Sequence, residues 1–170
     1  ATSLDGYIAD RDGGIEWLDK IPNPEQIDMG YHSFMSCIDA LIMGRNTFKK
    51  VLNFGMPWPY EKPVFVWSRT LKEVPNELAG KVELVAGQPK EILELLYGRG
   101  LGRIYIDGGK TIQSFLQDDL IDEITITKIP VILGAGIPLF GELSQMQTFS
   151  LVKSEVFLNQ IVQDTYIRKR

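Results

Sequence analysis

Cysteine and histidine are almost absent from this chain, which has one of each, Cys37 and His32. A single cysteine cannot form an intramolecular disulfide, and the pair cannot complete the usual four-ligand zinc site. A hydrolase with a Ser-His-Asp or Cys-His arrangement would have to depend on His32 alone. The composition therefore predicts no metal site, and a chain without disulfides suits a reducing cytoplasm.

Excess positive charge and long apolar runs are also missing. The 18 Lys and Arg residues against 22 Asp and Glu residues leave a formal net charge of −4, which argues against a general nucleic-acid binder. No apolar run has the length of a membrane span, and no signal peptide is present. Hydrophobic residues at 44% and charged residues at 24% are typical of a soluble globular protein. We expect a cytoplasmic protein that binds neither nucleic acid nor membrane.

A single domain is expected over residues 1–170, because the chain has no internal repeat, low-complexity tract or linker. Runs of β-branched and aromatic residues predict strands at Ala40–Met43, Pro63–Trp67, Val82–Val85, Arg103–Ile106, Glu123–Pro130, Ser150–Leu158 and Ile161–Arg168. Helical periodicity predicts helices at Pro24–Ser36 (with a cap at Asn23), Asn46–Leu52, Pro89–Tyr97 and Thr111–Gln117.

The order of these elements predicts the fold class. Strand and helix alternate in the first two-thirds of the chain, which favours a mostly parallel sheet with helices on both faces. The last third has strands without intervening helices, and Asn159-Gln160 makes a short link typical of an antiparallel hairpin. We predict an α/β fold with three layers, α/β/α, and a mixed sheet that ends in a C-terminal hairpin. The chain begins at Ala1 in strand-like sequence, which leaves open whether a further strand precedes it.

Two glycine turns connect a predicted strand directly to a helix. Gly44 is followed by Arg45 and Thr47, and the Asp107–Thr111 segment has the sequence Asp-Gly-Gly-Lys-Thr. Helix N-termini present backbone amides and a dipole that favour an anion, and arginine adds a bidentate phosphate donor. The second turn is not a P-loop, because Ile104 stands where that motif needs its first glycine. Tight turns chosen only for their backbone angles would use the same residues.

A third predicted strand, Pro63–Trp67, ends in Ser68 and Arg69, so three strands carry phosphate-binding groups at their carboxyl ends. In open α/β sheets, ligands bind at that edge. The coincidence of three such strand ends favours a nucleotide site more than any one of them does.

Asp28 is our candidate for a catalytic proton carrier. The predicted first helix places Tyr31 and His32 at helical spacing from Asp28. A carboxylate turned into an apolar cleft would have a raised pKa and could relay a proton, whereas a solvated carboxylate would only face water. Tyr31 and Asp5 are candidate substrate contacts, although Asp5-Gly6 is in the first place typical of a turn between short strands, with a ligand contact as the lesser alternative.

Several motifs occur in an order that resembles a known family. They are Ser3–Ala9, Met43–Phe48, Ser68–Thr70, Asp107–Thr111 and Pro130–Phe140. Together they resemble the dihydrofolate-reductase-like superfamily, and in particular the branch with the reductase domain of the bifunctional riboflavin-biosynthesis deaminase–reductase. The resemblance covers nearly the whole chain.

The resemblance implies that NADPH lies across the strand ends. It implies that the phosphates contact Gly44, Arg45 and Thr47, that Ser68 and Arg69 flank the adenosine phosphate, and that Gly108, Gly109, Lys110 and Thr111 hold the pyrophosphate. Arg45 would lie near the 2′-phosphate. In dihydrofolate reductases a helix carboxylate precedes the glycine of the Met-Gly-Arg motif by about sixteen residues, which is the spacing of Asp28 from Gly44.

The chain departs from both branches of the superfamily. Residues 9–24 lack the Pro-Trp loop that dihydrofolate reductases place over the nicotinamide, and no arginine-rich helix segment is present to engage a ribose phosphate. We expect no deaminase domain in this chain. The substrate therefore stays open.

These observations predict an NADPH-dependent reductase that transfers hydride to a small heterocyclic or carbonyl/imine substrate. A riboflavin-pathway-like pyrimidine reductase ranks first, ahead of a dihydrofolate reductase. A noncatalytic NADPH- or nucleotide-binding protein is the alternative from another class. The C-terminal hairpin is rich in Val, Phe, Ile and Tyr, and an exposed edge strand favours pairing. The resemblance to riboflavin-pathway reductases implies dimerisation through the same region, so we also expect a homodimer.

Overall fold

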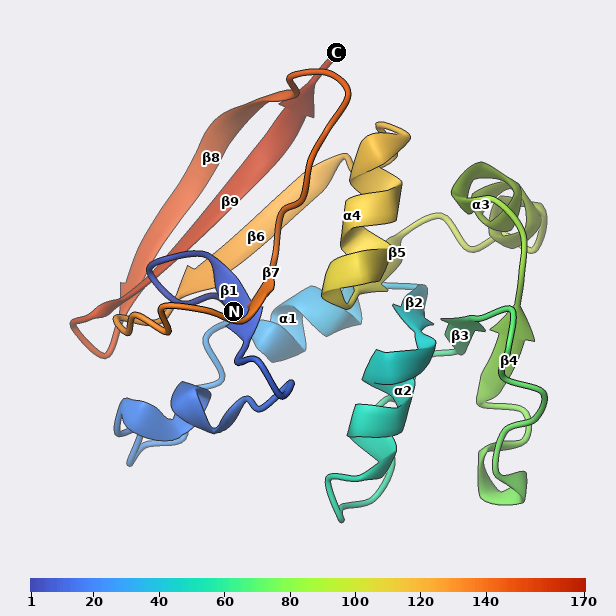
Figure 1. The fold of residues 1–170 in the computed structure, drawn as a ribbon, viewed down its shortest axis with the longest axis horizontal. Helices are drawn as coiled ribbons and strands as arrows, with labels where there is room; N and C mark the ends of the chain where they lie inside the picture. The colour runs from blue at the N-terminus through green and yellow to red at the C-terminus, as the bar shows by residue number, and fades with distance from the viewer. The chain divides into compact units, whose positions relative to one another are not determined.

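The computed structural model describes all residues, 1–170, as two compact units (Figure 1). One unit is the continuous segment Gly30–Asp118, and the other combines Ala1–Met29 with Asp119–Arg170. The expectation of one domain over the chain stays a prediction. No helix in the structure is both long enough and apolar enough to span a bilayer.

The unit Gly30–Asp118 contains a four-stranded parallel sheet of order β4-β3-β2-β5. Its strands are β2 (Ala40–Gly44), β3 (Val64–Trp67), β4 (Val82–Val85) and β5 (Ile104–Asp107). Its helices are α1 (Tyr31–Ser36), α2 (Arg45–Leu52), α3 (Pro89–Gly98) and α4 (Gly109–Gln117), with a short 3-10 helix η2 (Asn76–Leu78). The predicted strands and the last three predicted helices are confirmed within one or two residues.

Side-chain packing explains why the central strands are apolar throughout. Residues 40–43 of β2 are completely buried, as expected for a strand covered on both faces. On one face, Leu41 and Met43 join a core to which α1 and α2 contribute. On the other face, Phe115 of α4 meets the ring of Trp67 edge-on, with ring centroids 5.9 Å apart. Figure 1 shows α1 and α2 on one side of this sheet and α3 and α4 on the other.

The predicted helix Pro24–Ser36 is wrong over its first half. The helix α1 begins at Tyr31, and the chain before it turns repeatedly, with positive φ at Gln26, Met29 and Gly30. Asn23 does not cap a helix. Its side chain accepts a hydrogen bond from the Ile27 amide at 2.9 Å and donates one to the Ile27 carbonyl at 2.8 Å. This local closure competes with helix formation, which is the usual reason that asparagine favours turns.

The unit formed by the two chain ends is built on antiparallel strands. Its strands are β1 (Tyr7–Ala9), β6 (Glu123–Lys128), β7 (Ile137–Pro138), β8 (Thr148–Phe157) and β9 (Ile161–Lys169), and its 3-10 helix is η1 (Glu16–Lys20). The sheets are β6-β9-β8 and β1-β7, and β8 with β9 forms the long hairpin visible in Figure 1. Trp17, Ile129 and Ile161 form the centre of its apolar core. The predicted C-terminal hairpin is confirmed.

A charged network lies on one face of the antiparallel sheet. The buried carboxylate of Asp164 on β9 accepts hydrogen bonds from Ser154 Oγ at 2.6 Å and from Lys128 Nζ at 2.9 Å. These contacts connect the three strands through one side chain, and they lower the pKa of Asp164. They explain why a carboxylate is tolerated at a shielded position.

Candidate nucleotide site at the sheet edge

The two predicted glycine turns lie side by side at the carboxyl edge of the parallel sheet. Strands β2 and β5 are hydrogen-bonded neighbours, with Met43 opposite Asp107, so the turns that follow them are adjacent. A Cβ added to Gly44 would lie 2.9 Å from Thr111 Oγ1, and one added to Gly108 would overlap Thr47 Oγ1. Gly108 also has a φ of +91°, which L side chains rarely adopt. Close packing therefore favours glycine at both positions, and the positive φ favours it further at Gly108.

The helices that begin at these turns have no side-chain caps. The N-cap residues are Gly44 for α2 and Gly108 for α4, and neither makes a side-chain hydrogen bond to the first turn. The backbone amides of both first turns therefore depend on solvent or a ligand. Two helix dipoles directed at one place favour an anion there.

The third helix at this edge differs. Helix α3 has a capping box, in which the Glu91 carboxylate accepts a hydrogen bond from the Gln88 amide at 2.8 Å and the Gln88 side chain bonds the backbone of residue 91. Its first-turn amides are thus partly satisfied by the chain itself. Of the three helices that follow strands at this edge, α2 and α4 therefore lack the side-chain cap that α3 has.

Cationic and hydroxyl groups surround the open N-termini. Arg45 at the start of α2 donates a hydrogen bond to Thr70 Oγ1, which connects it to the loop after β3. In that loop Ser68 Oγ accepts hydrogen bonds from the Leu71 and Thr70 amides, at 3.0 and 3.2 Å. Arg69 is exposed beside them. Lys110 is exposed in the first turn of α4.

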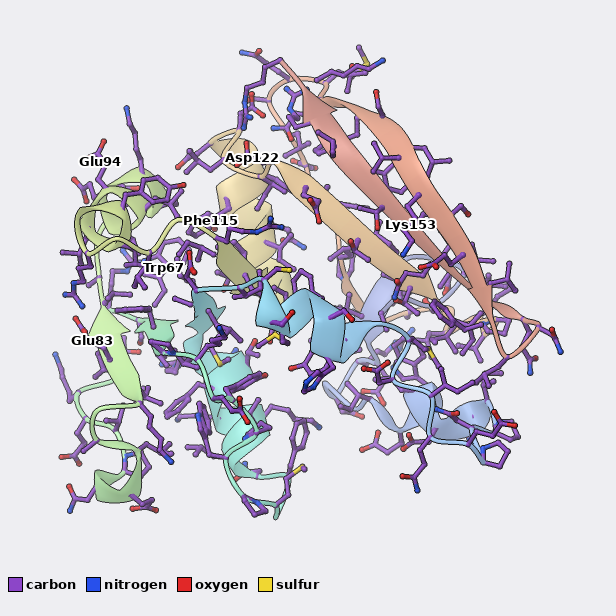
Figure 2. All side chains as sticks on the ribbon, turned by 180° about the vertical axis from the view of Figure 1, so that it is seen from behind. Trp67, Glu83, Glu94, Phe115, Asp122 and Lys153 are labelled. Carbon is purple, nitrogen blue, oxygen red and sulfur yellow. The ribbon has the colours of Figure 1, made fainter.

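A cleft of about 400 Å³ opens between the ends of β3 and β4, lined by Trp67, Ser68, Arg69, Gly87 and Gln88. The Trp67 indole donates a hydrogen bond to the Gly87 carbonyl at 3.0 Å, which fixes the ring against this wall. Figure 2 labels Trp67 and Phe115 at the place where β3 and α4 meet. The lining of the cleft includes an arginine and no carboxylate. These donors fit the phosphates and ribose of a dinucleotide such as NADPH.

A carboxyl group and tyrosines gather at the end of β5, a grouping that the sequence analysis did not find. Burial raises the pKa of Asp107, although the Gly108 amide donates a hydrogen bond that acts in the opposite direction. The pKa values of Tyr60 and Tyr105 are raised first by burial and then by the negative charge of Asp107. The Tyr105 ring meets Phe34 of α1 edge-on at 5.1 Å. Tyr31 is half-exposed, and the pKa of its hydroxyl group is raised first by partial burial and then by the negative charge of Asp107.

The signal for this grouping is weak but present in the sequence. Tyr105 and Asp107 are two residues apart on β5, so both side chains lie on the same face of the sheet. Leu41 and Met43, their partners on β2, lie on that face as well. The tyrosine at position 60 comes from a loop distant in sequence, and no periodicity connects it to β5.

The two carboxylates predicted from the sequence belong to the unit formed by the chain ends. Asp28 is exposed in the turns that precede α1, so the predicted placement on a helix face with Tyr31 and His32 is wrong. Asp5 lies in a turn, where its carboxylate accepts hydrogen bonds from Ser3 Oγ at 2.6 Å and from the amides of Leu133 and Gly134 at 3.1 and 2.7 Å. These bonds lower the pKa of Asp5 and support the turn interpretation.

Residues 1–163 match the family described as the RibD C-terminal domain. The chain belongs to this family. It is 52% identical to a candidate riboflavin biosynthesis protein from Shewanella sp. PV-4, whose crystal structure superposes with a TM-score of 0.97 over 99% of this chain and 96% of the other. The sequence-based resemblance is thereby confirmed.

More distant solved structures share the fold of this RibD C-terminal domain. A deaminase/5-amino-6-(5-phosphoribosylamino)uracil reductase from Thermotoga maritima is 19% identical with a TM-score of 0.75, over 99% of this chain and 54% of that one. A dihydrofolate reductase from Enterococcus faecalis, complexed with NADP(H), is 15% identical with a TM-score of 0.67, over 99% and 93%. At these identities the likeness concerns the fold alone, and it confirms the predicted α/β class.

Proposed function

We propose that this protein is an NADPH-dependent reductase that acts on a small heterocyclic or carbonyl/imine substrate. The observation that carries the proposal is the pair of uncapped helix N-termini, α2 and α4, side by side among cations at the carboxyl edge of the sheet. The riboflavin branch of the family and the NADP(H) of the dihydrofolate reductase relative support it. The cytoplasm is the compartment we propose for this chemistry.

Different residues at this edge would bind different parts of the cofactor. In the proposed complex Gly44 and Thr47 contact phosphates at the start of α2, and Gly108, Gly109, Lys110 and Thr111 hold the pyrophosphate at the start of α4. Ser68 and Arg69 lie along the adenosine end. Arg45, directed toward the same loop by its hydrogen bond to Thr70, would bind the 2′-phosphate.

When bound, NADPH supplies a hydride, and the protein has to orient the acceptor and provide a proton. The protein's own part would be to deliver that proton to the nitrogen or oxygen bonded to the reduced carbon of the acceptor. We assign the proton to Asp107, because burial raises the pKa of its carboxyl group and keeps a larger protonated fraction at a given pH. Asp28 remains the second candidate, and Tyr31 and Asp5 remain proposed substrate contacts.

The cofactor proposal is tested by titrating NADPH and NADH against the pure protein. One charge-assisted contact to the 2′-phosphate is worth about 1.5–3 kcal/mol, so we expect NADPH to bind at least about tenfold more tightly than NADH. Equal affinities, or no binding of either cofactor, would contradict the assignment. Tight binding without NADPH oxidation by any pyrimidine, dihydrofolate or carbonyl acceptor would favour the noncatalytic alternative.

The proton assignment is tested by single-turnover NADPH oxidation in Asp107→Asn and Asp28→Asn. Loss of a general acid costs about 10²–10⁴-fold in rate, and we expect that loss in Asp107→Asn, with NADPH affinity nearly unchanged. The wild-type rate should fall as the pH rises through the raised pKa of Asp107, and Asp107→Asn should lack this limb. The opposite pattern, with the loss in Asp28→Asn, would return the role to Asp28.

A homodimer is the proposed assembly. Strand β8 lies at the edge of the antiparallel sheet and exposes Leu151, Val152 and Val156 by 55%, 54% and 64%. An exposed apolar edge favours pairing with a second chain. Light scattering at micromolar concentration should give twice the mass of one chain. A mass of 19.2 kDa, that of one chain, would contradict the proposal.

A further inference from the structure

We propose that two copies of this chain associate by antiparallel pairing of β8 with β8 of the second copy, with Ser154 at the two-fold axis. Strand β8 is an edge strand, since the sheet has the order β6-β9-β8 and Figure 1 shows β8 on the outer side of β9. A bulge between Leu151 and Lys153 bends the strand, so the pairing covers residues 152–156, from the bulge onward. The inference rests on the proposed homodimer and specifies its interface and register.

The central sequence of β8 is complementary to itself when it is read backwards. Residues 152–156 are Val-Lys-Ser-Glu-Val, and the reverse order is Val-Glu-Ser-Lys-Val. In the proposed pairing, Lys153 lies opposite Glu155 of the partner subunit. Val152 lies opposite Val156 of the partner subunit, and both valines are exposed in a single chain. Opposite charges and apolar side chains placed directly across two strands stabilise a sheet, and by symmetry each of these pairs occurs twice.

The charges of β8 distinguish this register from the other symmetric ones. Every second residue of an edge strand directs its backbone N–H and C=O groups outward, so the two-fold axis of an antiparallel pairing passes through a residue. An axis at Lys153 or at Glu155 would place like charges directly opposite each other, which is destabilising. An axis at Val152 or Val156 would leave both charges opposite uncharged residues. Among these five positions, only the axis at Ser154 pairs each charge with its opposite.

Contacts within one chain are compatible with this pairing. Lys153 Nζ lies 2.6 Å from Glu155 Oε2, so both side chains lie on the same face of β8. A lysine on an edge strand usually opposes pairing with another chain, but here Glu155 balances its charge. The pairing would join two such ion pairs into one network of four charges, which stabilises more than isolated surface pairs do. The small side chain at the axis, Ser154, donates its hydrogen bond to Asp164 of its own chain at 2.6 Å.

Charge reversal tests the register. Lys153→Glu and Glu155→Lys each place like charges opposite each other twice. We therefore expect at least about tenfold weaker dimerisation in each variant, measured by sedimentation equilibrium on the full chain. The double variant Lys153→Glu/Glu155→Lys restores opposite charges and should dimerise like the wild type. An equimolar mixture of the two single variants should form a heterodimer, because one copy then carries only negative charges at these positions and the other only positive ones.

Two control variants make the same charge changes in the other unit. Lys90 and Glu94 are exposed on α3, and Lys90→Glu and Glu94→Lys should dimerise like the wild type. Single β8 variants that dimerise like the wild type would overturn the interface. A double variant or a mixture that stays monomeric while melting like the wild type would overturn it as well. A monomeric wild type would overturn the proposed homodimer and this interface together, whereas the reductase proposal is decided separately by the NADPH titration.

Engineered cysteines test the position of the axis, in a Cys37→Ser background because Cys37 is exposed. Directly opposite residues of two antiparallel strands have Cα atoms about 4.5–5.5 Å apart, within the range of a disulfide. Ser154→Cys should therefore crosslink to itself on oxidation. Val156→Cys should not, because its two copies would lie about 13 Å apart, but it should crosslink to Val152→Cys in a mixture. Crosslinking of Val156→Cys to itself as readily as in this mixture would overturn the register.

Discussion

The two ends of the parallel sheet differ in the side-chain acceptors that they provide for backbone amides. At the amino end, Asp39 Oδ2 accepts hydrogen bonds from the amides of Gly102 and Arg103, both at 2.8 Å. At the carboxyl end, the N-caps of α2 and α4 supply no such acceptor. The same kind of backbone group is satisfied by a side chain at one end, whereas no N-cap side chain satisfies it at the other.

Helix α3 shows that this difference is not a general property of the carboxyl end. Its capping box satisfies amides with Glu91, although the helix begins at the same edge as α2 and α4. In the proposed site, an anion would take the place of the acceptors that the sequence omits at α2 and α4. Glycine at both open N-caps is the form that this omission takes.

The largest effect is expected from closing an open turn with Gly108→Ala. The new Cβ would overlap Thr47 Oγ1 at a φ of +91°. We expect a loss of about 3 kcal/mol in the free energy of unfolding, from left-handed strain and overpacking together, and at least about tenfold weaker NADPH binding. Gly100→Ala is the control, since Gly100 has a φ of +79° and open space around it. It should lose only about 1–2 kcal/mol and bind NADPH normally; equal binding losses would contradict the role of Gly108.

The next effect concerns one exposed arginine at each end of the sheet. Arg45 lies at the carboxyl end and Arg103 directly before β5 at the amino end, and both are exposed. Arg45→Ala should weaken NADPH binding about 10- to 100-fold and leave NADH binding nearly unchanged, because only NADPH carries the 2′-phosphate. Fluorescence titration measures both. Arg103→Ala should change neither affinity, and a similar loss in this control would indicate a nonspecific charge effect.

A smaller effect is expected from opening the closed helix. Glu91→Ala removes the carboxylate that accepts the Gln88 amide, which should cost about 0.5–2 kcal/mol of stability in thermal or urea unfolding. NADPH affinity should stay within about twofold, because the proposed phosphate contacts lie on α2 and α4. Glu94, exposed on the same helix, provides the control Glu94→Ala, which should unfold like the wild type. Strongly weakened NADPH binding in Glu91→Ala would place the ligand at α3.

The smallest effect concerns the amino end. Hydrogen bonds from the Arg103 and Gly102 amides lower the pKa of Asp39 below 3.8, so its stabilisation is present at neutral pH and is lost as the pH falls through that lowered value. Asn retains one acceptor oxygen and removes the charge. The melting temperature of Asp39→Asn should lie a little below that of the wild type at pH 7, and the two should converge in acid. A difference that is independent of pH would show that the charge contributes nothing.

The groups at the carboxyl edge of the parallel sheet could be predicted from the sequence because each of them directly follows its strand. The turns at Gly44 and Gly108 and the hydroxyl and cation after Trp67 follow directly on their strands, and parallel strands bring such ends together. Strand existence was predicted for the same reason, since buried β-branched runs need no knowledge of their partners. The confirmed fold class follows from the order of these local elements.

The rest depended on interactions that no periodicity reports. The helix predicted to start at Pro24 fails because the Asn23 side chain closes a turn on Ile27. The strands β1 and β7 are short, and they exist because distant segments pair, with Tyr7 opposite Pro138. The grouping of Tyr60 with Asp107 likewise joins segments far apart in sequence, so their shifted pKa values had no sequence signal.

The division of the chain into one continuous and one discontinuous unit has a consequence for how the protein is made. All internal contacts of Gly30–Asp118 can form once that segment has left the ribosome, whereas the contacts of Ala1–Met29 within its own unit must wait for Asp119–Arg170. The turn at Asp5, for example, is completed only when the amides of Leu133 and Gly134 have been synthesised. Domains form as units during synthesis, and pairings between distant segments are slow. The parallel sheet can therefore assemble early in translation, while Ala1–Met29, although synthesised before it, folds only after Asp119–Arg170 has been made.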